Sequence, residues 1–189
     1  MKIGLYFGSF NPVHVGHLII ANHIVNNTAL NQIWFVVSPQ NPLKQNDTLL
    51  NKFHRKYLID SAIEGENKLR TSTIEFSLPI PSFTIDTLTY AKEKYKEHEF
   101  AIIMGSDSLQ NLPKWKNYER LIKDYEIFVY ERPGFSMDKV NGKNIIGLKA
   151  PLLDISSTKI REMIKQGESI KFLVPDIVKE EIEKNHYYK

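Results

Sequence analysis

Short apolar runs alternate along the chain with longer segments in which apolar residues recur every three or four positions. The continuous apolar runs predict buried β-strands, and the three-to-four spacing predicts amphipathic helices. The strand-like runs are KIGLYF (2–7), IWFVVS (33–38), LRTSTIEF (69–76), FAIIM (100–104), EIFVYE (126–131) and NIIGL (144–148). The helix-like runs are HLIIANHIVNN (17–27), LLNKFHRKYLIDSAI (49–63), TIDTLTYAKEKY (84–95) and NYERLIKD (117–124).

This alternation predicts an α/β fold with a Rossmann-like, doubly wound and mostly parallel sheet that carries helices on both faces. Two more helical runs follow, SSTKIREMIKQ (156–166) ahead of Gly167 and PDIVKEEIEKN (175–185) with Pro175 at its start. No internal repeat, low-complexity tract or Gly- and Ser-rich linker divides the sequence. We therefore expect a single domain over 1–189, with a short C-terminal helical region over about 155–189.

Composition narrows the class of protein. Of the 189 residues, 42% are hydrophobic, which is enough to bury a core, and none is cysteine, which excludes disulfides and thiolate metal clusters. No apolar run approaches the ~20 residues of a membrane helix and no signal-peptide pattern is present, so we expect a cytoplasmic protein without a membrane partner. The 25 basic and 22 acidic residues are interspersed, as on solvated helix faces, and predict no nucleic-acid partner.

Candidate chemistry first arises in the loop after the first strand, because open α/β sheets bind ligands beyond the carboxyl ends of their strands. This loop, FGSFNPVHVGH (7–17), has neither the Walker A pattern nor the G-x-G-x-x-G dinucleotide pattern. Gly8 and Ser9 nevertheless permit a close approach of the backbone to a ligand, and a helix whose free N–H groups attract anions follows Pro12. The loop therefore predicts a phosphate site.

His14 and His17 are three positions apart and share a face near the start of this helix. Imidazoles placed there can donate to phosphate oxygens and stabilise the charge that develops during phosphoryl transfer. Two surface histidines without a function are one alternative. A zinc site is another, but it needs a third ligand, and His23 lies off the shared face.

A second phosphate pattern, DISSTKIR (154–161), lies near the other end of the chain. Ser156, Ser157 and Thr158 offer caps and donors at a helix N-terminus, and Lys159 and Arg161 follow one turn into the helix. An ordinary N-cap with a solvated arginine is the alternative for this stretch taken alone. Together with the first loop, it favours phosphate binding.

The two stretches resemble the signatures of the nucleotidylyltransferase superfamily, an H-x-G-H motif (14–17) and an I-S-S-T-x-x-R motif (155–161). Within that superfamily the whole chain resembles the bacterial nicotinate mononucleotide adenylyltransferases. Asn11 stands where that family commonly has Asp, and N-P-L-K (41–44) is shorter than the usual N-P-P-H-K. Further matching stretches are QNPLK (40–44), SFTIDTL (82–88), MGSDSLQNLPKW (104–115) and ERPG (131–134).

The resemblance implies transfer of the adenylyl group of ATP to nicotinate mononucleotide, which yields deamido-NAD and pyrophosphate. A phosphate monoester has its second pKa near ~6, so the acceptor needs no general base, in accord with the absence of an obvious nucleophile. Magnesium would arrive on the ATP phosphates, without a protein metal site. A homo-oligomer is compatible with this picture. The resemblance implies catalytic roles for His14, His17 and Arg161, and ATP contacts from Gly8, Ser9, Phe10, Gly105, Asp107, Ile155, Ser156, Ser157 and Thr158.

For the mononucleotide, the resemblance implies that Trp115 stacks on the pyridine ring, and that Thr84 and the backbone N–H of Lys116 bind the nicotinate carboxylate. Three further residues are implied near the ribose phosphate, namely Asn41, Lys44 and Arg132. A tryptophan at position 115 is otherwise more typical of a core or rim anchor, and Asp107 of an N-cap to the next helix.

Two other functions remain open from the sequence. Another member of the superfamily would use a different acceptor, such as nicotinamide mononucleotide or phosphopantetheine, or CTP as donor. A non-catalytic nucleic-acid-binding module would instead show an affinity that falls steeply with salt, and it would release no pyrophosphate.

Overall fold

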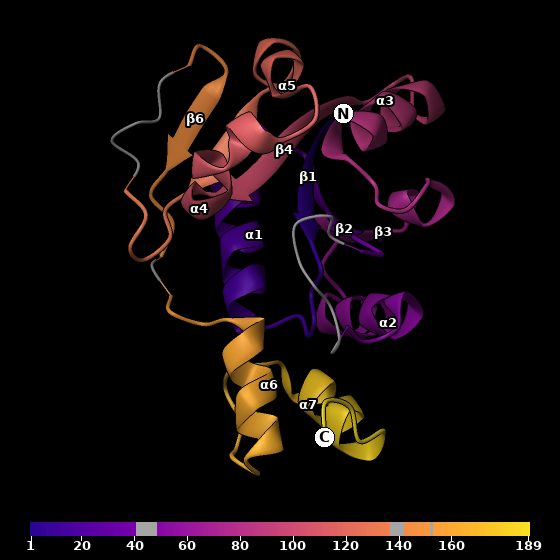
Figure 1. Cartoon of the computed structure of the whole chain (residues 1–189), viewed down its shortest axis with the longest axis vertical. Coiled ribbons are helices and arrows are strands. Elements are labelled where there is room, and N and C mark those ends of the chain that lie inside the picture. The colour runs from indigo at the N-terminus through magenta and orange to yellow at the C-terminus, as the bar shows by residue number, and fades with distance from the viewer. Residues whose placement is uncertain (41–48, 137–141, 152) are drawn as a thin grey trace.

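Figure 1 shows the computed structural model of the chain, which describes residues 1–40, 49–136, 142–151 and 153–189. Its strands are β1 (Lys2–Gly8), β2 (Gln32–Val37), β3 (Leu69–Ser72), β4 (Glu99–Gly105), β5 (Ile127–Tyr130) and β6 (Ile145–Leu148). Its α-helices are α1 (Val15–Asn27), α2 (Lys52–Ala62), α3 (Thr84–Lys94), α4 (Ser106–Gln110), α5 (Tyr118–Asp124), α6 (Ser157–Lys165) and α7 (Asp176–Lys184). Two 3-10 turns are η1 (Ile74–Ser77) and η2 (Leu112–Lys114).

The strands form one six-stranded sheet in the order β3-β2-β1-β4-β5-β6, and every neighbouring pair is parallel. The chain starts in the middle, builds outward to β3, and returns to place β4 on the other side of β1. This topology confirms the predicted Rossmann-like, doubly wound fold. The strand order reverses between β1 and β4, and their carboxyl ends are therefore where a ligand crevice is expected.

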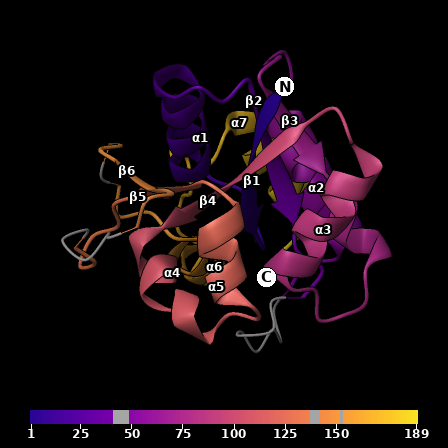
Figure 2. The same ribbon diagram turned by 90° about the horizontal axis from the view of Figure 1, so that it is seen from above.

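Side chains along the strands alternate between two buried layers, as the two-residue period of a strand requires. In β1, Tyr6 packs in the layer that also receives α1, α2, α6 and α7, whereas Leu5 packs in the layer covered by α3, α4 and α5. Figure 2 shows α1 and α3 on opposite sides of β1. Both faces of the sheet are therefore buried, which explains why its strands read as nearly continuous apolar runs.

The C-terminal helices α6 and α7 lie beyond α1 and α2 at one end of the molecule (Figure 1). Ile160 of α6 and Val178 and Ile182 of α7 are buried in the same apolar cluster as α1 and α2. This packing carries the start of α6 back to the loop after β1. In the part of the chain that the structure describes, no helix has both the length and the apolar character needed to cross a membrane.

The predicted strand over 69–76 is wrong in its second half. β3 ends at Ser72, and the next residues turn into η1, where the N–H of Phe76 donates to the carbonyl of Thr73 at 2.9 Å. The cause is Glu75, which is only 3% exposed and accepts hydrogen bonds from the hydroxyls of Ser82 and Thr87. A buried carboxyl must find donors, and this requirement overrides the strand propensity of its neighbours.

Candidate active site

A cavity of about 900 Å³ opens at the carboxyl ends of β1 and β4, where the strand order reverses. Its walls come from the loop after β1, the first turn of α4, the end of β5 and the N-terminus of α6. Both sequence motifs therefore reach the same cavity. Its position is the one expected for a ligand site in an open α/β sheet.

The loop after β1 is held by close packing and by a buried cation. A Cβ atom on Gly8 would lie 2.7 Å from the ring of Phe10, so only glycine permits this approach. Arg55 of α2 is 1% exposed and donates to the carbonyl oxygens of Ser9 and Ser38, which lie on the loops after β1 and β2. Burial lowers the pKa of Arg55 to about 10, which leaves the guanidinium charged at neutral pH.

His14 and His17 meet as expected from their spacing, because their rings stack with centroids 3.6 Å apart. The backbone N–H of His14 donates to Nδ1 of His17 at 3.3 Å. Nδ1 is therefore an acceptor, so the proton of a neutral His17 ring lies on Nε2. Burial, and then the positive charge of Arg132, lower the pKa of His14 to about 4, so His14 is neutral at pH 7. A Cβ atom on Gly16 would approach His14 Nδ1 to 3.1 Å.

The start of α6 is hydrogen-bonded to the loop after β1. Ser157 Oγ donates to the carbonyl oxygen of Pro12 at 2.9 Å, and Arg161 Nη1 donates to that of Asn11 at 2.8 Å. Ser156 caps the helix by accepting from the N–H of Lys159 at 3.3 Å. Because the Ser157 hydroxyl already donates its hydrogen bond to the Pro12 carbonyl, the donors that α6 can offer to an anion are the backbone N–H groups of its first turn that Ser156 does not cap.

Ser156, Ser157, Thr158 and Arg161 line the cavity, whereas Ile155 is not part of its lining. Arg161 Nη2 contacts Thr158 Oγ1 at 3.4 Å, and Ile155 lies close to Gly16 of the first motif. The structure thus brings together the two stretches that the sequence analysis paired, although they are about 140 residues apart along the chain.

After β4 the chain turns at Gly105, where a Cβ atom would lie 2.9 Å from Cγ of Arg132. The next residue, Ser106, is fully buried; its Oγ accepts from the N–H of Arg132 at 2.9 Å and donates to the carbonyl of Phe135 at 2.7 Å. Asp107 lies in the first turn of α4, a position that suits an N-terminal acid. Arg132 lines the larger cavity together with Asp107.

A smaller pocket of about 170 Å³ adjoins the first, and Trp115 lines both. Thr84, Trp115 and Lys116, for which the resemblance implies contacts with the pyridine end of the mononucleotide, line it together. We call this pocket the slot. Asn41 and Lys44, which were predicted near the ribose phosphate, lie outside the described residues.

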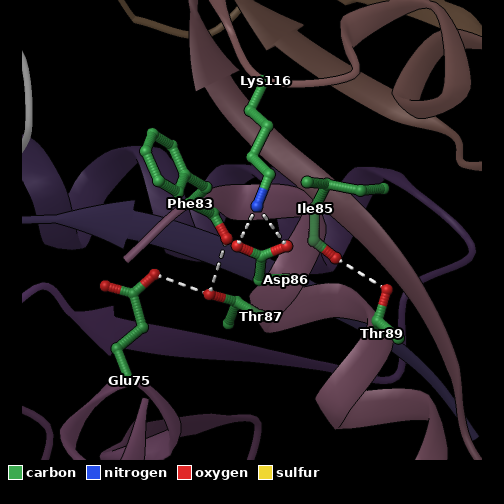
Figure 3. Close-up of polar contacts among 7 residues, drawn as sticks. All are labelled: Glu75, Phe83, Ile85, Asp86, Thr87, Thr89 and Lys116. Carbon is green, nitrogen blue, oxygen red and sulfur yellow. Dashed lines mark hydrogen bonds and ion pairs between the residues drawn. The ribbon is translucent and has the colours of Figure 1, made fainter. Parts of the chain in front are cut away.

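Glu75, which lines the slot, and Asp86, which binds the slot residue Lys116, are two carboxylates to which the sequence analysis assigned no role (Figure 3). Glu75 lines it and accepts from Ser82 Oγ at 2.8 Å and Thr87 Oγ1 at 2.9 Å. Burial raises the pKa of Glu75, although both of these hydrogen bonds act in the opposite direction. Asp86 binds the ammonium of Lys116 through both of its oxygens. Two features of the sequence could have drawn attention to these carboxylates. Glu75 is the only acid in the strand-like run over 69–76, and Asp86 lies within the SFTIDTL stretch (82–88).

Comparisons with known proteins agree with this geometry. The family model "cytidylyltransferase-like" matches residues 5–163. A protein from Cytophaga hutchinsonii named "probable nicotinate-nucleotide adenylyltransferase" is 50% identical over 189 residues, covering 100% of this chain and 98% of the relative. A protein of the same name from Flavobacterium psychrophilum is 48% identical over 192 residues and is covered completely, as is this chain.

Among solved structures, the Plasmodium falciparum nicotinic acid mononucleotide adenylyltransferase complexed with NaAD superposes with a TM-score of 0.86. The alignment covers 99% of this chain and 97% of that one at 23% identity. At this level of identity the likeness establishes a shared fold.

Proposed function

This chain belongs to the cytidylyltransferase-like family and, within it, to the nicotinate-nucleotide adenylyltransferases, and from this premise we propose how its two adjoining cavities divide the reaction. The protein is a nucleotidyltransferase that transfers the adenylyl group of ATP to nicotinate mononucleotide, forming deamido-NAD and pyrophosphate. ATP occupies the larger cavity, and the pyridine end of the mononucleotide enters the slot. The observation that carries the proposal is the hydrogen bonding of Ser157 and Arg161 to the loop that bears the two histidines.

In this reaction a phosphate oxygen of the mononucleotide attacks the α-phosphorus of ATP. The new P–O bond forms as the bond to the β-phosphate oxygen breaks, and that oxygen leaves with the electron pair as pyrophosphate. The acceptor phosphate has its second pKa near ~6, so it is mostly dianionic at neutral pH and needs no general base. The protein then has to align the two phosphates and neutralise the charge on the leaving group.

The donors in the larger cavity suit that task. His17, with its Nε2 proton, and the neutral His14 donate to the α- and β-phosphates, and Arg161 with the first-turn N–H groups of α6 holds the β,γ end. Because a carbonyl of the loop already orients Arg161, little rotamer freedom is lost when ATP binds. The remaining ATP contacts in this proposal are Gly8, Ser9, Phe10, Gly105, Asp107, Ile155, Ser156, Ser157 and Thr158.

Magnesium enters this proposal as part of the ATP complex. Over the described ranges of the chain, no three His, Cys, Asp or Glu side chains come together in a way that could hold a metal ion. Mg²⁺ commonly keeps its waters and binds substrate phosphates with few protein ligands, which fits a cavity furnished with N–H, hydroxyl and guanidinium donors. The ion would neutralise charge on the phosphates.

At the acceptor end, the slot is lined by the aromatic side chains of Phe7, Phe83 and Trp115 and by several donors. Trp115 stacks on the pyridine ring, while Thr84 and the N–H of Lys116 bind the nicotinate carboxylate. Arg132 reaches the ribose phosphate from the larger cavity, which it shares with Asp107. From the sequence alone we also assign Asn41 and Lys44 to the acceptor site. From the sequence alone, too, we propose that the reaction takes place in the cytoplasm.

A substrate panel tests the function. Pyrophosphate release is measured with ATP or CTP as donor and with nicotinate mononucleotide, nicotinamide mononucleotide or phosphopantetheine as acceptor, and the product is identified by mass. We expect rapid release with ATP and nicotinate mononucleotide and formation of deamido-NAD. Faster turnover with CTP or phosphopantetheine would assign the chain to another branch. Salt-sensitive binding of nucleic acid without any pyrophosphate release would point to the non-catalytic alternative.

A further inference from the structure

Lys116, which lines the slot, forms an ion pair with Asp86 of α3 that we call the bridge (Figure 3). Lys116 Nζ lies 2.8 Å from Asp86 Oδ2 and 3.1 Å from Asp86 Oδ1, and 5.0 Å from the centroid of the Phe83 ring. Asp86 belongs to the first turn of α3, whereas Lys116 directly follows Trp115. The bridge therefore joins the two walls from which the mononucleotide contacts are expected.

Asp86 is the third residue of α3, where an acidic side chain could bind the N-terminus of its own helix, yet it binds Lys116. An acidic side chain at the third helical position commonly turns back to accept from the N-cap backbone N–H. In the described residues of α3, no side chain caps the helix, and the Asp86 carboxylate binds Lys116 instead. The N–H of Asp86 itself donates to the carbonyl of Phe83 at 3.0 Å, so the N–H groups of Thr84 and Ile85 are the ones that can face an anion in the slot.

The opposite wall has little structure of its own. Trp115 follows the three-residue turn η2, and its N–H donates to the carbonyl of Leu112 at 2.9 Å. Lys116 is exposed, and Asn117 adopts a left-handed conformation with φ of 53°. A short turn followed by such a residue is a weak frame for an aromatic side chain that must meet a planar ring. A link to the regular helix α3 supplies the missing restraint.

We propose that Asp86 is a positioning residue for the mononucleotide. Through Lys116 it holds the Trp115–Lys116 segment at a set separation from Thr84, and it keeps its own carboxylate away from the N-terminus of α3. The identity of the substrate in this inference rests on the proposed function, whereas the bridge between Asp86 and Lys116 is observed in the structure. Asp86 needs no contact with the substrate in this role.

The first test compares Asp86→Asn with Asp60→Asn. Asp60 pairs with Lys56 on α2 and is a matched control, since its side chain is 42% exposed against 45% for Asp86. For Asp86→Asn we expect KM for nicotinate mononucleotide to rise about 3- to 5-fold, the upper range for loss of an exposed ion pair, with kcat and KM for ATP within about twofold of the parent, because only acceptor binding is weakened. Asp60→Asn should match the parent. A lower KM for the mononucleotide would overturn the proposal, because it would mean that the Asp86 charge repels the substrate.

A double-mutant cycle asks whether Asp86 acts through Lys116. Asp86→Asn and Lys116→Gln each remove the same bridge. KM for the mononucleotide in the double variant should therefore be no higher than in the more severely affected single variant. Exchange of the two charges, Asp86→Lys with Lys116→Asp, should restore KM for the mononucleotide to within about threefold of the parent. Effects that multiply, together with no rescue on exchange, would show that the two side chains act separately.

Amide hydrogen exchange of the substrate-free protein provides a readout that does not depend on activity. Residues 112–118 should exchange faster in Asp86→Asn than in the parent or in Asp60→Asn, because opening of this segment becomes easier. If the parent failed to use nicotinate mononucleotide, the proposed function would be wrong while this exchange still tested the bridge. If the parent were active and Asp86→Asn matched Asp60→Asn in KM and in exchange, the positioning role would be wrong.

Discussion

The two cavities are built in different ways. The larger one is lined and supported by buried groups, with Arg55 1% and His14 3% exposed, and backbone carbonyls bind the Arg55 and Arg161 guanidiniums directly. Beside the slot, Lys116 forms an ion pair with Asp86 in which both side chains are 45% exposed. Exposed ion pairs contribute little to stability and are screened by salt. A buried charged group is costly unless it is hydrogen-bonded, so loss of any one of its partners is strongly destabilising. In the proposed assignment the reacting phosphates meet this rigid frame, whereas the pyridine ring meets a segment held by one exposed ion pair.

The largest effect is expected in the rigid cavity. Replacement of His17 by Ala should lower kcat on the order of 10²-fold or more while the fold remains intact, because a donor to the developing charge is lost. His23→Ala, on the same helix but away from the cavity lining, is the control and should keep full activity. Steady-state kinetics with both substrates measure the effect on kcat, and circular dichroism shows whether each variant is folded. A variant within threefold of the parent would remove His17 from the catalytic assignment.

Selectivity between the two pyridine nucleotides should follow from the donors of the slot. A carboxylate accepts charge-assisted hydrogen bonds that are roughly twice as strong as neutral ones, while the amide NH₂ of nicotinamide would meet donors and lose about 1–3 kcal/mol per unpaired group. We expect nicotinate mononucleotide to be preferred by at least ~10-fold in kcat/KM. Comparable efficiency with the two acceptors, measured at saturating ATP, would mean that the slot is not a carboxylate site.

The aromatic wall of the slot can be tested by Trp115→Ala. Stacking of a base on an aromatic ring contributes about 1–3 kcal/mol, so KM for the mononucleotide should rise about 10-fold. KM for ATP, measured with the same variant, serves as the internal control and should change much less. An equal rise in both KM values would indicate a general disturbance of the two cavities in place of a lost stacking partner.

The smallest effect concerns the stability that Glu75 links to pH. Its pKa is raised in the folded state, so the proton-linked stability is present below the unfolded pKa and is lost as pH rises through the folded one. Residue 75 of Glu75→Gln does not titrate, and the free energy of unfolding of this variant should therefore improve relative to the parent as pH rises from 4.5 to 8. Urea unfolding across this range measures the difference.

Glu183→Gln, at an exposed carboxylate on α7, controls for the general loss of a negative charge. A Glu75→Gln variant whose relative stability fell with rising pH would contradict the assigned direction of the shift.

Much of the fold could be predicted because its strands are buried on both faces. A strand such as Phe100–Met104 is apolar without interruption and allows few other interpretations. The prediction over 69–76 failed at Glu75, since the turn there depends on hydroxyls of Ser82 and Thr87 that arrive from α3 and the segment before it. Ser82 and Thr87 lie 7 and 12 positions from Glu75, but the local pattern does not reveal that the chain folds back to bring their hydroxyls to its carboxylate.

By itself the sequence determined the alternation of strands and helices and the presence of the H-x-G-H and I-S-S-T-x-x-R motifs. These features are local, because periodicity, glycine conformation and helix capping act within a few residues. Only the tertiary structure decided that Arg161 orients on the Asn11 carbonyl, 150 positions away, and that Asp86 turns from its own helix end to Lys116, 30 positions away. Such pairs depend on the order of strands in the sheet and on which groups become buried together, and these are properties of the assembled fold.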